Sequence, residues 1–78
     1  MPSLGDVVPR NVAAERARRR WTQAQLAERL GWSKSKVSAF ETGVQRVFAD
    51  ELGPLCVALG VPLVKLAEGC DEMSDLGL

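Results

Sequence analysis

Residues 21–43, WTQAQLAERLGWSKSKVSAFETG, contain the same local pattern twice. A tryptophan followed by a hydroxyl residue, first Trp21-Thr22 and then Trp32-Ser33, precedes each of two short stretches of helix-forming residues. Serine and threonine accept hydrogen bonds from the free backbone N–H groups at a helix start, and a preceding apolar residue packs onto the first turns. The pattern therefore predicts two helices, with Thr22 and Ser33 as their capping residues.

A glycine separates the two predicted helices. Gly31 follows Leu30, and glycine adopts the left-handed conformation of a helix end with little strain. The link is too short to lay two helices antiparallel, so the helices must cross steeply. This is the geometry of a helix-turn-helix, whose second helix is expected to run from Lys34 to about Thr42, before Gly43.

A further helix is expected on the N-terminal side of this motif. Residues 9–19, PRNVAAERARR, are rich in helix-forming residues and begin with a proline, which is tolerated in a first helical turn. Residues 1–8 contain a proline and a glycine and show no periodicity. We therefore expect a flexible arm over residues 1–8 and a helix from Pro9 to about Arg19.

An amphipathic helix is expected after the motif. Its apolar residues follow the i, i+3, i+4, i+7 spacing of one helix face, at Leu52, Leu55, Cys56 and Leu59. Two starts are compatible with the sequence, because Pro54 is tolerated only near a first turn. Either Asp50 caps this helix, or Gly53 does.

The C-terminal part predicts one short helix and a tail. Residues 62–68 are expected to be helical, with Leu63 and Leu66 facing inward, and the acidic residues 70–78 are expected to be disordered or to form an interface. No alternating strand pattern occurs. The sequence thus predicts an all-α fold of five helices, with a domain over residues 9–69 between an arm and a tail.

The charge distribution favours a polyanionic partner at the N-terminal half. The formal net charge is zero, but residues 1–46 contain nine Lys or Arg against four Asp or Glu, whereas residues 47–78 contain one against six. Lysine and arginine drive binding to nucleic acids by neutralising phosphates. The basic half, which contains the helix-turn-helix, is therefore where double-stranded DNA is expected to bind.

The second helix of the motif carries the candidate base contacts. Val37 and Phe40 must face the core, which turns the other side of this helix outward. A lysine can donate to guanine, a serine can donate or accept, and an alanine methyl can contact the methyl of thymine. The residues expected to contact bases in the major groove are Lys34, Ser35, Ser38 and Ala39.

Phosphate contacts are expected at the start of the first helix of the motif, on the flanks of the second helix and in the loop after it. Gln23 is the first residue of its predicted helix, where free backbone N–H groups and the helix dipole favour an anion. The alternative for each candidate is a solvated side chain. The expected phosphate contacts are Gln23, Lys36, Thr42 and Arg46.

The stretch Arg16–Gly43, RARRRWTQAQLAERLGWSKSKVSAFETG, resembles the Cro/C1-type (Xre-like) helix-turn-helix family of phage repressors and bacterial transcription regulators, and the resemblance extends through LGVPLVKLAEG. It implies a compact lambda-repressor-like domain of five helices and an ion pair between Arg16 and Glu41. The alternative for Arg16 is a solvated side chain. The family commonly has glycine where this chain has Arg20, so the link is expected either to differ from that of the family or to be mildly strained.

Taken with the residues, the resemblance implies a sequence-specific transcription regulator, a repressor that binds operator DNA as a homodimer, at least on DNA. Neither a cofactor nor a small-molecule ligand is expected. The rival function is a protein-interaction module, such as an antitoxin or adaptor. Val47 and Phe48 are apolar residues in a predicted loop. We expect them either to be exposed and form an interface with a partner, or to fold back onto the core.

Other function classes find little support in the sequence. Ser33 and Lys36 have the Ser-x-x-Lys spacing of serine acyltransferases, but a helix cap accounts for Ser33, so no enzyme is expected. The chain has no histidine and two cysteines, so neither a metal site nor a disulfide is expected. No apolar run approaches the length of a membrane span, and a cytoplasmic protein is expected.

Overall fold

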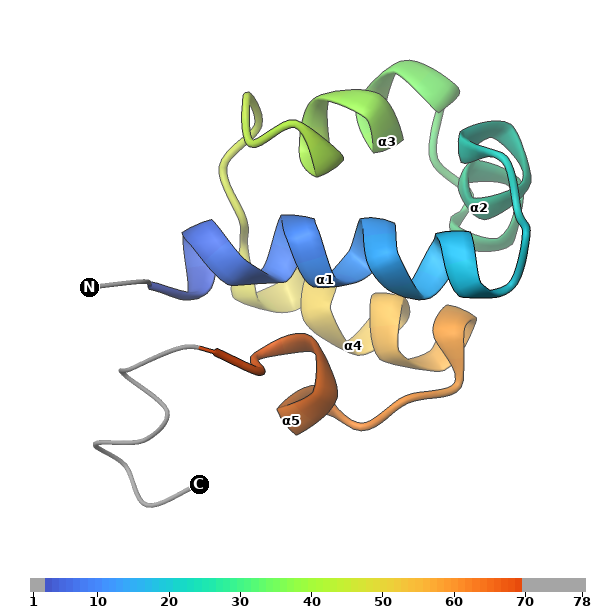
Figure 1. The fold of residues 1–78 in the computed structure, drawn as a ribbon. Helices are drawn as coiled ribbons and strands as arrows, with labels where there is room; N and C mark the ends of the chain where they lie inside the picture. Colours follow the sequence, from blue (N-terminus) through green and yellow to red (C-terminus); the bar gives the residue numbers. More distant parts are fainter. Residues whose placement is uncertain (1–2, 70–78) are drawn as a thin grey trace.

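The computed structural model describes residues 3–69, which form five α-helices: α1 (Leu4–Arg18), α2 (Gln23–Leu30), α3 (Lys34–Glu41), α4 (Ala49–Leu59) and α5 (Leu63–Leu66). The expected all-α fold is confirmed. Helix α1 runs through the middle of the molecule, with α3 on one side and α4 and α5 on the other (Figure 1). Helix α2 packs against α3 and α4. The expected tail lies outside the described residues.

Helix α1 begins at Leu4 and not at Pro9, so the expectation of a flexible arm is wrong for residues 3–8. The Asp6 carboxylate accepts a hydrogen bond from the backbone N–H of Ser3 at 3.0 Å, which satisfies one free donor at the helix start. Val7 and Val8 are fully buried. Burial contributes about 1.5–3 kcal/mol for each valine, which offsets the cost of about 3 kcal/mol for a proline inside a helix.

Helix α4 begins at Ala49, before both of the starts expected from the sequence. Its capping residue is Phe48, whose backbone N–H donates to Glu51 Oε1 at 3.3 Å. Pro54 is the sixth residue of the helix, the same position that proline holds in α1. The next residue, Leu55, is buried. As in α1, the burial of apolar side chains offsets the cost of a proline inside the helix.

Helix α5 is shorter than expected. Its Leu66 is fully buried as expected, but Leu63 is 43% exposed and does not face the core. The Asn11 side chain of α1 donates to the backbone carbonyls of Leu66 at 2.7 Å and Glu68 at 2.9 Å. These bonds satisfy carbonyls at the end of α5 and attach that end to α1.

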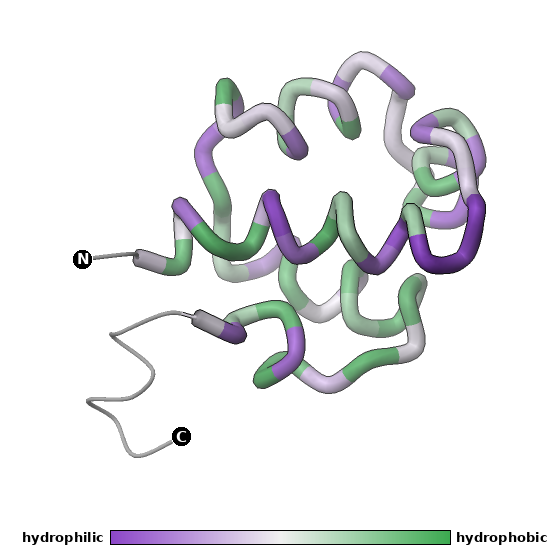
Figure 2. The backbone as a smooth tube through the Cα atoms, viewed as in Figure 1, coloured by the Kyte–Doolittle hydropathy of each residue, from purple (hydrophilic) through white to green (hydrophobic). Residues whose placement is uncertain are grey.

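All five helices contribute to one apolar core. Hydrophobic residues are prominent along α4 and α5, whereas the link from α1 to α2 is strongly hydrophilic (Figure 2). No helix in the described part of the chain has the length and apolarity that crossing a membrane requires. The buried core residues are Val7, Val8, Val12, Leu26, Ala27, Val37, Phe40, Leu55, Leu59 and Leu66.

The loop residues Val47 and Phe48 behave differently from each other. Val47 is half-buried and packs against the core, whereas the Phe48 side chain is 51% exposed. Of the two alternatives left open by the sequence, folding back onto the core therefore holds for Val47. Phe48, the capping residue of α4, leaves an exposed apolar side chain beside the loop.

Candidate nucleic-acid interface

The expected capping residues define the start of α2 and the turn between α2 and α3. Thr22 Oγ1 accepts from the backbone N–H of Gln25 at 3.1 Å, and Gln25 Oε1 accepts from the backbone N–H of Thr22 at 2.8 Å. Gly31 has a φ of 72°, in the left-handed region. Ser33 Oγ accepts from the backbone N–H of Lys36 at 3.0 Å, so this serine is a helix cap, as expected.

A tryptophan packs at the entry to each helix of the motif, Trp21 before α2 and Trp32 before α3. Trp32 packs against Phe40 of α3, with ring centroids 5.6 Å apart. The Arg29 guanidinium lies over the Trp21 ring, 4.0 Å from its centroid. Both tryptophans are half-buried against the core, so the entry to each helix of the motif is anchored by an aromatic ring.

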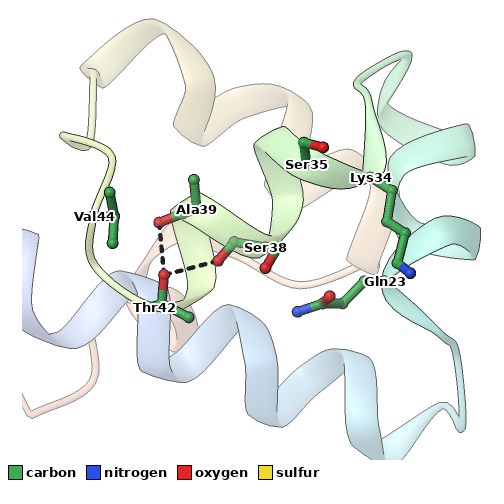
Figure 3. Close-up of a pocket in the computed structure, with 7 residues that line it drawn as sticks. All are labelled: Gln23, Lys34, Ser35, Ser38, Ala39, Thr42 and Val44. Carbon is green, nitrogen blue, oxygen red and sulfur yellow. Dashed lines mark hydrogen bonds between the residues drawn. The ribbon is translucent and has the colours of Figure 1, made fainter.

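An open groove of about 530 Å³ lies along α3 and the N-terminus of α2 (Figure 3). It contains all four residues expected to contact bases and two of the four expected to contact phosphates. Val44 is an addition that sequence reasoning missed. The residues that line the groove are Gln23, Lys34, Ser35, Ser38, Ala39, Thr42 and Val44.

The chemistry of this groove changes along α3. Lys34 and Ser35 lie at the N-terminal end of the helix, and Ala39 and Val44 lie toward the opposite end, with Ser38 between (Figure 3). From the N-terminal to the C-terminal end of α3, the groove thus presents an ammonium group, then hydroxyl groups, and then methyl groups. Such donors, acceptors and apolar groups match the chemical groups on base edges in a major groove.

Gln23 extends from the first turn of α2 into the same groove. Its Nε2 donates to Glu41 Oε1 at 3.1 Å, a contact between α2 and α3 that the sequence did not indicate. A carboxamide nitrogen carries two hydrogens, so one N–H of Gln23 remains for an anion. The contact with Glu41 restricts where that N–H can point.

Arg16 and Glu41 form an ion pair behind the groove. Arg16 Nε lies 2.7 Å from Glu41 Oε2, and Arg16 Nη2 lies 3.0 Å from Oε1. The Glu41 side chain is 5% exposed, and its hydrogen bond holds the pKa of Arg16 above the ordinary value. Arg16 Nη1 also donates to the carbonyl of Trp21 at 2.7 Å. The pair thereby joins α1, the link to α2, and α3.

The link between α1 and α2 carries the strain expected from the missing glycine. Arg20 has a φ of 58° and is the only non-glycine residue with positive φ in the described part of the chain. Its backbone N–H donates to the carbonyl of Ala17 at 3.0 Å. The left-handed conformation costs roughly 1–2 kcal/mol for a residue with a side chain.

Two expected phosphate contacts are already engaged within the protein. The Lys36 ammonium lies 3.0 Å from Glu51 Oε2 of α4 and 4.3 Å from the Trp32 ring centroid, and Lys36 does not line the groove. The Thr42 hydroxyl donates to the carbonyls of Ser38 at 3.0 Å and Ala39 at 3.3 Å. The Thr42 hydroxyl has a single hydrogen, so it would have to leave these carbonyls to donate to a phosphate, whereas the Lys36 ammonium keeps two further N–H groups. The fourth candidate, Arg46, is exposed in the loop after α3.

Much of the positive charge of the N-terminal half is neutralised internally. The buried Glu15 carboxylate pairs with Arg18 at 2.9 Å and with Arg19 at 3.0 Å, which the sequence did not indicate. Arg16 and Lys36 are paired as described above. Within the described residues, the cations outside ion pairs are Arg10, Arg20, Arg29, Lys34 and Arg46.

No group of three or more potential metal ligands occurs among residues 3–69. Cys56 is half-buried in α4, and burial raises the pKa of its thiol. The other cysteine, Cys70, lies outside the described residues, so the structure does not address its pairing.

The comparisons with known proteins agree with this geometry. Residues 10–69 match the family model of the helix-turn-helix domain. The crystal structure of the clp gene regulator ClgR from Corynebacterium glutamicum is 27% identical, with a TM-score of 0.76 over 85% of this chain and 86% of that one. The hypothetical transcription factor NHTF from Neisseria is also 27% identical, with a TM-score of 0.79 over 95% of this chain and 85% of that one.

A second ClgR structure, 24% identical with a TM-score of 0.75 over 97% of this chain and 85% of that one, shows the same fold. No curated protein matches the chain significantly. The family match covers most of the chain, including every helix from α2 to α5. This protein belongs to the helix-turn-helix domain family.

Proposed function

We propose that this chain is a sequence-specific regulator of transcription, a Cro/C1-type repressor that binds double-stranded DNA with α3 in the major groove. The observation that carries the proposal is the groove along the exposed face of α3, where the ammonium of Lys34 and two serine hydroxyls lie together. The family match and the likeness to the regulators ClgR and NHTF support it.

Base contacts are assigned to the groove side of α3. A major groove about 12 Å wide accepts one helix, and Val37 and Phe40 hold the opposite side of α3 in the core. Lys34 donates to guanine O6 or N7, and the serine hydroxyls donate or accept as the base requires. The proposed base contacts are Lys34, Ser35, Ser38 and Ala39.

Phosphate contacts are assigned chiefly to Gln23 and Arg46. Gln23 retains one N–H beside the N-terminus of α2, where backbone N–H groups favour an anion. Arg46 is exposed, and no ion pair within the described residues engages it. Thr42 contributes only if DNA binding breaks its present hydrogen bonds, and the Lys36 ammonium, which lies outside the groove, already has its charge paired with Glu51.

Binding as a homodimer is part of the proposal. An α-helix of eight residues is roughly 12 Å long, which corresponds to three or four base-pair steps of about 3.4 Å. So short a site has little specificity, and a second copy related by two-fold symmetry doubles the number of base pairs contacted. Helix α5, the loop at Val47-Phe48 and residues 70–78 are the candidate contacts between copies.

The test is selection from random double-stranded DNA, followed by affinity measurements at several salt concentrations. We expect one enriched sequence with two-fold symmetry. A dimer that neutralises about six phosphates should give a slope near −5 in a plot of log affinity against log salt. Failure to enrich any sequence would contradict the proposal.

The second candidate function is a protein-interaction module. Exposed apolar side chains on the α4–α5 side of the molecule favour it, namely Val57, Leu63 and Val64. A module of this kind should bind its protein partner with little dependence on salt and should enrich no DNA sequence. The same selection experiment therefore separates the two functions.

A further inference from the structure

Val44 is an apolar residue in a place where the fold does not need one. Its side chain is 83% exposed, so it contributes almost nothing to the core. A single exposed valine is normal on a protein surface, and Val57 of α4 has the same exposure. Val44 differs because it lines the groove that holds the candidate base contacts.

The backbone holds Val44 in a defined position beside α3. Gly43, with a φ of 79°, turns the chain back at the end of the helix. The backbone N–H groups of Val44 and Gln45 then both donate to the carbonyl of Ala39, at 3.0 and 3.1 Å. Because a β-branched side chain has few rotamers, the methyl groups of Val44 are largely oriented before any ligand binds.

We propose that Val44 recognises the 5-methyl group of a thymine, with Ala39 beside it. This inference rests on the proposed function. Thymine is the base that presents a methyl group in the major groove, and the other three bases lack that group. A polar base edge placed against valine would lose its water without gaining a hydrogen bond. The apolar end of the groove therefore selects thymine.

The position of this thymine follows from the geometry of α3. Lys34 and Ala39 are five residues apart, which corresponds to about 7.5 Å along a helix axis. A base-pair step is about 3.4 Å, so the helix covers roughly two steps over this distance. We expect the thymine about two base pairs from the base pair that Lys34 contacts.

The experiment replaces each thymine of the selected sequence, one at a time, with deoxyuridine, which removes only the 5-methyl group. Affinities are measured for the full chain and for Val44→Ala and Val57→Ala. Val57→Ala is the matched control because it removes an equally exposed valine outside the groove. Thermal unfolding of each variant checks that the fold is retained.

For the unmodified chain, we expect one deoxyuridine to weaken binding about fourfold, the value for one buried methyl group. Val44→Ala should bind thymine and deoxyuridine equally at that position, and Val57→Ala should keep the fourfold preference. If a sequence is selected but the preference is absent, or persists in Val44→Ala, the assignment of Val44 is wrong and DNA binding stands. If no sequence is selected, both proposals fail.

Discussion

Lys34 and Lys36 lie two residues apart on α3 but in different environments. Lys34 lines the groove, whereas Lys36 is paired with Glu51 and covered on one side by Trp32. Lys34→Ala should therefore relax base preference at one operator position, at a cost of about 1–3 kcal/mol in binding. Affinities for the operator and its single-base variants provide the measurement.

Lys36→Ala is the matched control for this prediction, because it removes the same side chain two residues away. It should leave base preference unchanged and lower the free energy of unfolding by up to about 1 kcal/mol, the range for a partly exposed ion pair. Equal loss of base preference in both variants would show that the groove does not determine which lysine contacts DNA.

Arg20 offers a second prediction at the scale of one residue. Its left-handed conformation is strained, and glycine relieves that strain but adds freedom to the unfolded chain. Arg20→Gly should raise the free energy of unfolding by about 0.5–1 kcal/mol, or the Tm by about 2–8 °C. Arg20→Ala keeps the strain and removes the charge, so an equal gain in that variant would assign the effect to charge.

At the scale of elements, the Arg16–Glu41 pair connects α1, α2 and α3, because Gln23 donates to the same carboxylate. Removing one partner leaves a buried charge unpaired. We expect Glu41→Leu or Arg16→Met alone to lower the free energy of unfolding by about 3–5 kcal/mol, a large part of the stability of a small domain. Urea unfolding measures this loss.

The double variant Arg16→Met, Glu41→Leu is the control. It leaves no unpaired charge, so it should recover most of the stability lost in either single variant. Gln23 also loses its acceptor in this variant, so DNA affinity should stay reduced even though the fold recovers. Additive losses in the double variant would argue against the pair as a coupled unit.

The contribution of Asp6, at the start of α1, to the stability of the fold depends on pH. Hydrogen bonds from the backbone N–H and hydroxyl of Ser3 hold the pKa of Asp6 below its ordinary value of 3.8. A carboxylate with a lowered pKa stabilises the fold above its unfolded pKa and loses that effect as the pH falls through the folded pKa. The contribution of Asp6 should therefore be present at neutral pH and disappear below about pH 4.

The measurement compares the Tm of the unmodified chain with that of Asp6→Asn from neutral to acidic pH. Asp6→Asn should have the lower Tm at neutral pH, and the difference should shrink as the pH falls below the ordinary range of aspartate. Asp50→Asn, on an exposed residue in the first turn of α4, is the control for a general effect of charge near a helix start. A constant difference at every pH would contradict this role of Asp6.

At the scale of the whole molecule, the prediction concerns two copies on one duplex. Each α3 enters a major groove, so two copies related by two-fold symmetry fit half-sites about one helical turn apart, roughly 34–36 Å. A duplex with both half-sites should bind more tightly than a duplex with one. Insertion of about five base pairs, half a helical turn, should remove this gain because the second copy then faces the other side of the DNA.

Binding stoichiometry on the same duplexes completes this test. Two chains are expected on the complete site, and one chain on a single half-site. An affinity unaffected by the insertion would contradict the homodimer and leave each copy as an independent DNA-binding unit. Of the cations outside ion pairs in residues 3–69, Lys34 lines the groove and Arg46 lies in the loop after α3, so these contacts should depend above all on Lys34 and Arg46.

The helix-turn-helix is predictable from the sequence because its signals are local. Thr22, Ser33 and Gly31 act on backbone groups within a few residues of themselves, and the inward pair Val37 and Phe40 shows which side of α3 is exposed. The four residues expected to contact bases therefore lie together in the groove. Whether they contact DNA remains a prediction.

Features that depend on distant neighbours follow from the assembly of the helices and not from local signals. Whether α1 and α4 extend through their prolines depends on apolar residues that the other helices bury. The Lys36 ammonium pairs with Glu51, a residue of another helix. Both outcomes depend on contacts that arise only when the helices assemble.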